Sequence, residues 1–99
     1  MTITIDLEGV VDKDSLFKRL DEELIVKEWG HNWDALYDCL HDLSEGGFTE
    51  KCEFPLTFEV TNWQGFREAN KGDFEKFKKI LEDQVVSHVD KGCVLTVHF

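Results

Sequence analysis

Alternating polar and apolar residues mark three segments of the chain as β-strands. Residues 2–7 alternate threonine or aspartate with isoleucine or leucine, and residues 54–60 and 93–99 alternate in a similar way. Because a strand turns successive side chains to opposite faces, this period of two predicts half-buried strands. Pro55, the only proline, fits the first residues of the second strand, since a proline in a strand interior removes a ladder hydrogen bond.

Apolar residues spaced three and four apart predict four helices between these strands. The first follows Asp12 or Asp14, either of which can cap a helix N-terminus. The second follows a short connection containing Gly30, and the others are expected at residues 63–69 and 73–89. The residues expected to face the core are Leu16, Phe17, Leu20 and Leu24 in the first helix, Trp33, Leu36, Leu40 and Leu43 in the second, and Phe74, Phe77, Leu81 and Val85 in the last.

The order of these elements, β-α-α-β-α-α-β, predicts an α/β fold. Strands joined by connections that contain helices run parallel, and such crossovers are right-handed. Residues 44–53, which include two adjacent glycines, are expected to form a loop, and no repeat or linker divides the chain. We therefore expect a single domain over residues 1–99, built as a three-stranded parallel sheet packed with helices.

Charge narrows the class of partner. The formal net charge is −10, and residues 1–53 hold 14 acidic and five basic residues, whereas residues 54–99 hold seven and six. An acidic field of this size repels nucleic acids and anionic membranes, and it attracts basic proteins and cations. We expect no direct contact with nucleic acid or membrane, and a basic protein as the partner.

The N-terminus and the cysteines favour a cytoplasmic protein. The first residues lack a basic segment followed by a long apolar run, so no signal peptide is expected. No segment has the roughly 18 apolar residues of a transmembrane helix. Cys39, Cys52 and Cys93 are odd in number and lack CxxC spacing, which predicts free thiols in a reducing compartment.

The most unusual segment lies between Glu28 and Glu50, where six acidic residues occur without a lysine or arginine. Asp34, Asp38 and Asp42 recur every four residues and are expected to share one face of the second helix. Like charges at that spacing destabilise a helix, and the helix dipole disfavours anions near the C-terminus. The helix retains these aspartates despite their mutual repulsion and the unfavourable helix dipole. This face therefore predicts a binding site for a positively charged group.

The last helix provides a comparison, because its acidic residues have basic neighbours. Glu75 precedes Lys79 by four residues, as Lys78 precedes Glu82 and Lys79 precedes Asp83, which is the spacing of solvated ion pairs. The aspartate face of the second helix has no such partners within its own segment. A solvated face that only promotes solubility remains the alternative to a binding site.

Catalysis and metal binding are two further hypotheses for this face. Two carboxylates one turn apart can serve as acid and base in hydrolysis, but they need a cleft and raised pKa values, which an exposed helix face does not provide. Asp34, Asp38, His41 and Asp42 offer ligands for a divalent metal, yet no zinc-binding or EF-hand spacing occurs. There is no glycine-rich phosphate loop or nucleophile triad, so we expect no enzyme and no cofactor.

Residues 29–40, WGHNWDALYDCL, resemble the second-helix signature of the barstar family, which is aromatic-Gly-acid-Asn-Leu-Asp-Ala-Leu-Trp-Asp-Cys-Leu. The identities are Gly30, Asn32, Asp34, Ala35, Leu36, Asp38, Cys39 and Leu40. Pro55-Leu56 in the second strand and Gly92-Cys93 before the last strand also fall in the family's order. The resemblance covers essentially the whole chain, with a longer loop after the second helix.

The resemblance implies a bacterial cytoplasmic inhibitor that protects its own cell, as an immunity protein or antitoxin, by blocking the active site of a basic ribonuclease. Such an active site is a cationic pocket for phosphate, so a carboxylate on a rigid helix can replace the phosphate. By resemblance, Asp38 is the phosphate-mimicking residue and Asp34 is its neighbour in the same basic pocket. The other residues expected to bind the partner are Glu28, Trp29, Gly30, Asn32, Tyr37, His41 and Asp42.

Several positions depart from the family pattern. They are Glu28, where the family has an aromatic residue, His31, where it has an acid, His41 and Asp42, where it has small residues, and Ser87 and Lys91, where it has further contact acids. The central acidic pair is kept while its periphery has changed, which predicts the same class of target with a different ribonuclease as partner. An acidic module for a basic partner that is not a nuclease is the alternative function.

Overall fold

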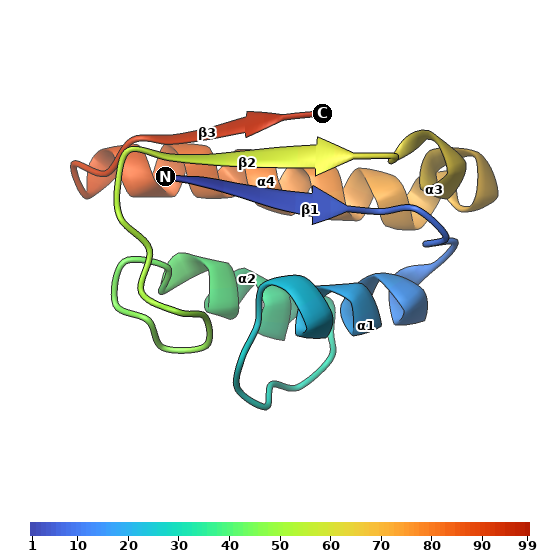
Figure 1. Ribbon diagram of the computed structural model, residues 1–99, viewed down its shortest axis with the longest axis horizontal. Coiled ribbons are helices and arrows are strands. Elements are labelled where there is room, and N and C mark those ends of the chain that lie inside the picture. Colours follow the sequence, from blue (N-terminus) through green and yellow to red (C-terminus); the bar gives the residue numbers. More distant parts are fainter.

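The computed structural model describes residues 1–99 and contains three β-strands and four helices (Figure 1). In chain order these are β1 (Thr2–Asp6), α1 (Lys13–Glu23), α2 (Trp33–His41), β2 (Leu56–Thr61), α3 (Gln64–Ala69), α4 (Lys71–Asp90) and β3 (Leu95–His98). The strands form one sheet in the order β1-β2-β3, and both neighbouring pairs are parallel. The predicted α/β fold and its element order are confirmed. None of the helices has the length and apolar character needed to cross a membrane.

The helices cover one face of the sheet. In β2, Leu56, Phe58 and Val60 are buried, whereas Thr57 and Thr61 on the opposite face are only half-buried. Figure 1 shows α4 behind the sheet and α1 and α2 below it, with no helix on the side toward the viewer. Parallel sheets usually have both faces covered. Here the alternating polar residues let one face stay in contact with water.

A core of 21 buried apolar residues joins the sheet to the helices. The predicted core positions that are buried are Leu16, Phe17, Leu20, Leu24, Leu36, Leu40, Leu43, Phe74, Phe77 and Leu81. Trp33 and Val85 differ from the prediction, since both are only half-buried. The reason for Val85 is that it lines a groove between α4 and β3. The polar residues Gln84 and His88 are fully buried in α4 instead, which the apolar pattern did not predict.

Side-chain caps determine where helices begin. The amide of Ser15 donates to the carboxylate of Asp12, and Oγ of Ser15 accepts from the amide of Asp12, so a capping box starts α1 as predicted for Asp12. The side chain of Asn70 accepts from the amide of Asp73 at 3.1 Å. Because of this cap, α4 begins at Lys71, two residues before the predicted start.

The second and third strands begin later than predicted. β2 starts at Leu56 rather than at residue 54, because Pro55 precedes it and has no N–H to donate to the ladder. β3 starts at Leu95, after a turn in which Gly92 adopts a φ of 78°. This conformation favours glycine, so Gly92 ends the preceding helix as predicted.

Candidate protein-binding site on α2

The segment before α2 is fixed to α1 by the carboxylate of Asp21. Nε1 of Trp29 donates to Oδ1 of Asp21 at 2.6 Å, and Nε2 of His31 lies 2.9 Å from Oδ2. The ring of Trp29 packs edge-on against Phe17 and His31, with centroids 4.9 and 4.7 Å apart. Trp29 is therefore partly buried against the core, and the chain enters α2 along a fixed path.

Asn32 and Gly30 hold the N-terminus of α2. Oδ1 of Asn32 accepts from the amide of Ala35 at 2.8 Å, and its Nδ2 donates to the carbonyl of Gly30 at 3.2 Å. A Cβ on Gly30 would lie 3.0 Å from that Nδ2 and 3.4 Å from the Cβ of Ala35, so a side chain here would disturb the cap. Asp34 follows in the first turn, where the helix dipole favours an anion.

The C-terminus of α2 is held by side chains of α4 and by Lys91, the C-cap residue of α4. The three contacts run from Nε2 of Gln84 to the carbonyl oxygen of Tyr37 (3.4 Å), from Nε2 of His88 to that of Leu40 (3.0 Å) and from Nζ of Lys91 to that of His41 (2.9 Å). The last carbonyls of a helix have no partner within it, so the two later bonds satisfy groups that would otherwise be unpaired. The charge of Lys91 also meets the negative end of the helix dipole. Both ends of α2 are therefore fixed by neighbouring elements.

The three aspartates of this segment are not equivalent. Asp34 and Asp38 are exposed, and neither forms a hydrogen bond or an ion pair within the chain. The helix ends at His41, so Asp42 is its C-cap and is half-buried. A Cβ on Gly47 would lie 3.2 Å from Oδ2 of Asp42, which places this carboxylate against the loop that follows. Two carboxylates, rather than three, are freely presented on α2.

Lysines of α4 lie next to one side of this acidic face. Lys76 and Lys79 line a shallow groove together with Trp33 and Asp34. Nζ of Lys76 lies 5.9 Å from the centre of the Trp33 ring. No local pattern of residues predicts this proximity, because the residues are far apart along the chain. Asp34 therefore shares a groove with two lysines and with Asp83, whereas Asp38, one turn later, lines no groove and remains open.

The predicted ion pairs of α4 are mostly absent. Only the pair of Lys79 and Asp83 is present, with Nζ 3.5 Å from Oδ1. Lys78 does not pair with an acid, and its Nζ lies 5.9 Å from the centre of the Phe99 ring. Pairing with lysines therefore separates the acids of α4 from those of α2 less clearly in the structure than the sequence predicted. What distinguishes α2 is that both of its ends are fixed while its carboxylates stay free.

His41 lies where α2 meets α4. Its ring stacks against that of Tyr37 with centroids 6.3 Å apart, and Oγ of Ser87 lies 3.2 Å from its Nδ1. Together with Lys91, these residues form a rim at the C-terminal end of α2. Glu28 is exposed in the segment before α2, at the opposite end of the helix from this rim.

Cys39 lies beneath the acidic face and belongs to the core. Burial raises the pKa of its thiol to about 11, and the carboxylates of Asp38 and Asp42 add to that rise. Cys39, Cys52 and Cys93 are all unpaired, as predicted. A thiol with so high a pKa stays protonated near neutral pH, so Cys39 is an inert packing residue.

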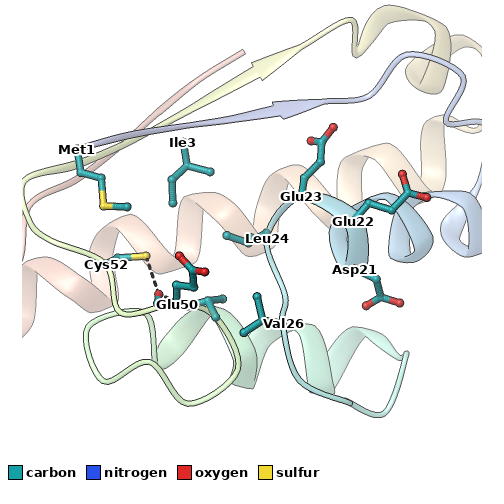
Figure 2. A pocket seen from close by; sticks show the side chains of 10 residues that line it. Met1, Ile3, Asp21, Glu22, Glu23, Leu24, Val26, Glu50 and Cys52 are labelled. Atoms are coloured by element: carbon teal, nitrogen blue, oxygen red, sulfur yellow. Dashed lines mark hydrogen bonds between the residues drawn. The ribbon is translucent and has the colours of Figure 1, made fainter.

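The surface of α2 contains no catalytic cleft. A pocket of about 310 Å³ lies between β1, the end of α1 and the segment before β2, and no carboxylate of α2 lines it (Figure 2). Its lining combines apolar residues such as Ile3 and Leu24 with acids such as Glu23 and Glu50. No group of three or more His, Cys, Asp or Glu side chains in the structure is arranged to hold a metal ion.

Comparison with known protein families identifies the family of the chain. The family model described as Barstar (barnase inhibitor) matches residues 1–99. This range includes all three strands, α2 and the α4 residues that hold it. No curated protein matches the chain.

Proposed function

The chain belongs to the barstar family, and on that basis we propose that it binds a basic ribonuclease and blocks the active site with the carboxylates of α2. Membership makes it a barnase-inhibitor-type protein and not an enzyme. The observation that carries the proposed mechanism is a helix fixed at both ends that presents Asp34 and Asp38 without partners in the chain. The inhibitor would act as an immunity protein in the bacterial cytoplasm, where it protects the cell that makes the ribonuclease.

A fixed carboxylate suits a pocket built for phosphate. Arginine and lysine side chains that bind phosphate form charge-assisted hydrogen bonds with a carboxylate equally well. Because Asn32 and His88 already hold the two ends of α2, little conformational entropy is lost when the partner binds. The net charge of −10 attracts a basic protein over a distance and so favours rapid association.

Asp38 is the better phosphate mimic of the two. Lys76 and Lys79 line a groove together with Asp34, whereas no lysine lines a groove with Asp38. We assign the central contact to Asp38 and a supporting contact to Asp34.

The rim around His41 supports a partner that differs from barnase in the matching region. Lys91 adds a positive charge at the C-terminal end of α2, and Ser87 is neutral. A ribonuclease that is strongly basic opposite this rim would be repelled by Lys91, so the preferred partner is neutral or acidic there. Glu28, Trp29, Gly30, Asn32, Tyr37 and Asp42 complete the proposed contact surface or support it.

The test is competition at the ribonuclease active site. Barnase-type ribonucleases are titrated with the chain, and RNA cleavage is followed with and without a nucleoside 3′-phosphate that occupies the phosphate pocket. We expect inhibition at one chain per enzyme and a Kd that rises in proportion to the added nucleotide. Inhibition that the nucleotide does not weaken would contradict occlusion of the active site, and binding of basic proteins without inhibition of any ribonuclease would favour the module for a non-nuclease partner.

The matched control variant has the same net charge as the test variant. The Asp34→Asn/Asp38→Asn variant removes two charges from α2, and Glu68→Gln/Glu75→Gln removes two exposed charges elsewhere. Only the first variant should lose inhibition. Equal losses in both would show that total charge, not the α2 site, governs binding.

A further inference from the structure

Two walls of the pocket in Figure 2 are joined by backbone hydrogen bonds. The amide of Val26, after α1, donates to the carbonyl of Phe48 at 2.8 Å, and Ile25 forms an isolated antiparallel bridge with Thr49. These contacts fasten the loop between α2 and β2 to the end of α1. The pocket, of about 310 Å³, therefore has walls that are already fixed in the chain itself.

Apolar side chains form the middle of this pocket. They are contributed by Ile3 of β1, by Leu24 at the end of α1 and by Val26 and Cys52. Figure 2 shows Leu24 and Val26 between Glu50 and the acids at the end of α1. A pocket of this size with an apolar lining and few polar groups is typical of sites for small molecules. An aliphatic chain placed there would be removed from water, which favours its binding.

Carboxylates lie at both ends of the apolar middle. Residues 21–23, in the last turn of α1, are all acidic, and Glu50 is contributed by the loop. No Lys, Arg or His side chain lines the pocket. Met1 also lines it, but its terminal ammonium group already donates to the carbonyl of Pro55 at 3.0 Å. The pocket therefore has a net negative charge, which attracts a cation.

The backbone of Glu50 is fixed, whereas its carboxylate is free. Its carbonyl accepts from Oγ1 of Thr49 at 2.9 Å and from Sγ of Cys52 at 3.4 Å. The residues Thr49 and Cys52 are only 2% and 4% exposed. The carboxylate of Glu50 forms no hydrogen bond or ion pair within the chain. It is therefore available for a charge-assisted hydrogen bond with a ligand.

The three acids of α1 differ in how far the chain already uses them. Oε2 of Glu23 accepts from the amide of Asp6 at 2.9 Å, and both oxygens of Asp21 are engaged by the segment before α2. Glu22 has only a loose contact, with Oε2 3.8 Å from Nε of Arg19. Such an exposed pair contributes little, so Glu22 is the acid of α1 that is most available to a second cationic group.

We propose that this pocket binds an aliphatic diammonium ion, with one ammonium group at Glu50, the other at Glu22 and the alkyl chain against Leu24. The net negative charge selects a cation, and the apolar middle selects an alkyl chain over a hydrated metal ion. The placement of acids at both ends selects two ammonium groups, because a monoamine would leave one end without a partner.

The ligand would connect the loop between α2 and β2 to the end of α1. It binds groups that only the folded chain brings together, so it should stabilise the fold by mass action. Neither Asp34 nor Asp38 lines the pocket. The proposal therefore does not depend on the proposed inhibition of a ribonuclease.

The experiment is a titration of the full chain with hexamethylenediamine, followed by amide NMR shifts and by thermal unfolding. It is done in about 0.1 M NaCl, where charges more than about 10 Å apart are largely screened. Hexylamine supplies the alkyl chain with one charge, and Mg²⁺ supplies two charges without the chain. We expect saturable shifts at Ile3, Leu24 and Glu50, a raised Tm, and a Kd for the diamine about threefold or more below that of either comparison ligand. Equal affinities for the diamine and Mg²⁺ would show that charge alone attracts the probe and would overturn the proposal.

The matched variants are Glu50→Gln and Glu45→Gln, because Glu45 is an exposed acid of the same loop that does not line the pocket. Glu50→Gln should weaken diamine binding about threefold or more, and Glu45→Gln should leave it nearly unchanged. The Asp34→Asn/Asp38→Asn variant should bind the diamine as the parent does, even where it no longer inhibits a ribonuclease. Parent-like binding by Glu50→Gln, or loss of binding in the α2 variant, would overturn the assignment to this pocket.

Discussion

Nε2 of His88 lies 3.0 Å from the carbonyl oxygen of Leu40, so a fully buried side chain of α4 holds the last turn of α2. Because the carbonyl accepts, Nε2 carries the hydrogen, and Nδ1 has no hydrogen-bond partner in the protein. A second proton would place a positive charge in the core near Lys91 and His41. Burial therefore lowers the pKa of His88, with smaller contributions from those two neighbours.

The first prediction concerns stability at acidic pH. The pKa of His88 is lower in the folded chain than the value of 6.5 for a free histidine, so folding favours the neutral ring. The stabilisation of the folded state by the neutral His88 ring is complete above about pH 6.5. It is lost as the pH falls through the lowered pKa of the folded state. In urea unfolding, His88→Gln should lower the free energy of unfolding at pH 7.5 by about 1–2 kcal/mol. It should also flatten the decline between pH 7.5 and pH 5.

The control for this prediction is His98→Gln, because His98 is exposed on β3. This variant should retain nearly the full stability of the parent at pH 7.5. If His88→Gln shows the same decline with acid as the parent, His88 does not account for the pH dependence.

The second prediction concerns the segment that leads into α2. Asp21→Ala removes the acceptor for both Trp29 and His31, and we expect it to cost about 1 kcal/mol in the free energy of unfolding. Because Asp21 stabilises this segment, limited proteolysis after Lys27 should also become faster. Glu22→Ala, which changes the adjacent exposed residue, should alter neither property. Unchanged proteolysis in Asp21→Ala would show that Trp29 packing alone holds the segment.

The third prediction concerns thiol reactivity. With a pKa of about 11, only about 0.1% of Cys39 is thiolate at pH 8, and the side chain is buried. Cys93 is half-buried and should react with a disulfide reagent much sooner. Mass spectrometry of the labelled chain should find Cys39 modified only after urea is added. Labelling of Cys39 as fast as Cys93 in the folded chain would mean that α2 opens readily from the core.

Sequence reasoning succeeded where the determinant is local. The alternation in β2 follows from burial of Leu56, Phe58 and Val60, and Asp12 caps α1 through a residue three positions away. It failed where a polar side chain serves a distant element. His88 was not among the predicted core residues of its helix, yet it is buried, and its partner is the carbonyl of Leu40.

The sequence likewise predicted only part of the candidate site. The spacing of Asp34 and Asp38 indicated a shared face, and both side chains are exposed on α2. The same spacing also included Asp42. This residue differs from the other two because the helix ends before it and its carboxylate lies against Gly47. The proximity of Lys76 to Trp33 depends on how α4 packs against α2, and no local pattern encodes it.

The most direct test of the proposed inhibition is the affinity of Asp38→Asn for a barnase-type ribonuclease, measured beside Glu75→Gln by titration calorimetry. Both variants replace an exposed carboxylate by an amide of the same shape. Asp38→Asn should weaken binding by about 2 kcal/mol or more, roughly 30-fold, which is the scale of an interface hot spot and one for which the barnase–barstar pair is itself a standard example. Glu75→Gln should stay within about twofold of the parent. An Asp38→Asn variant that binds as tightly as the parent would contradict the proposal that this carboxylate occupies the phosphate pocket.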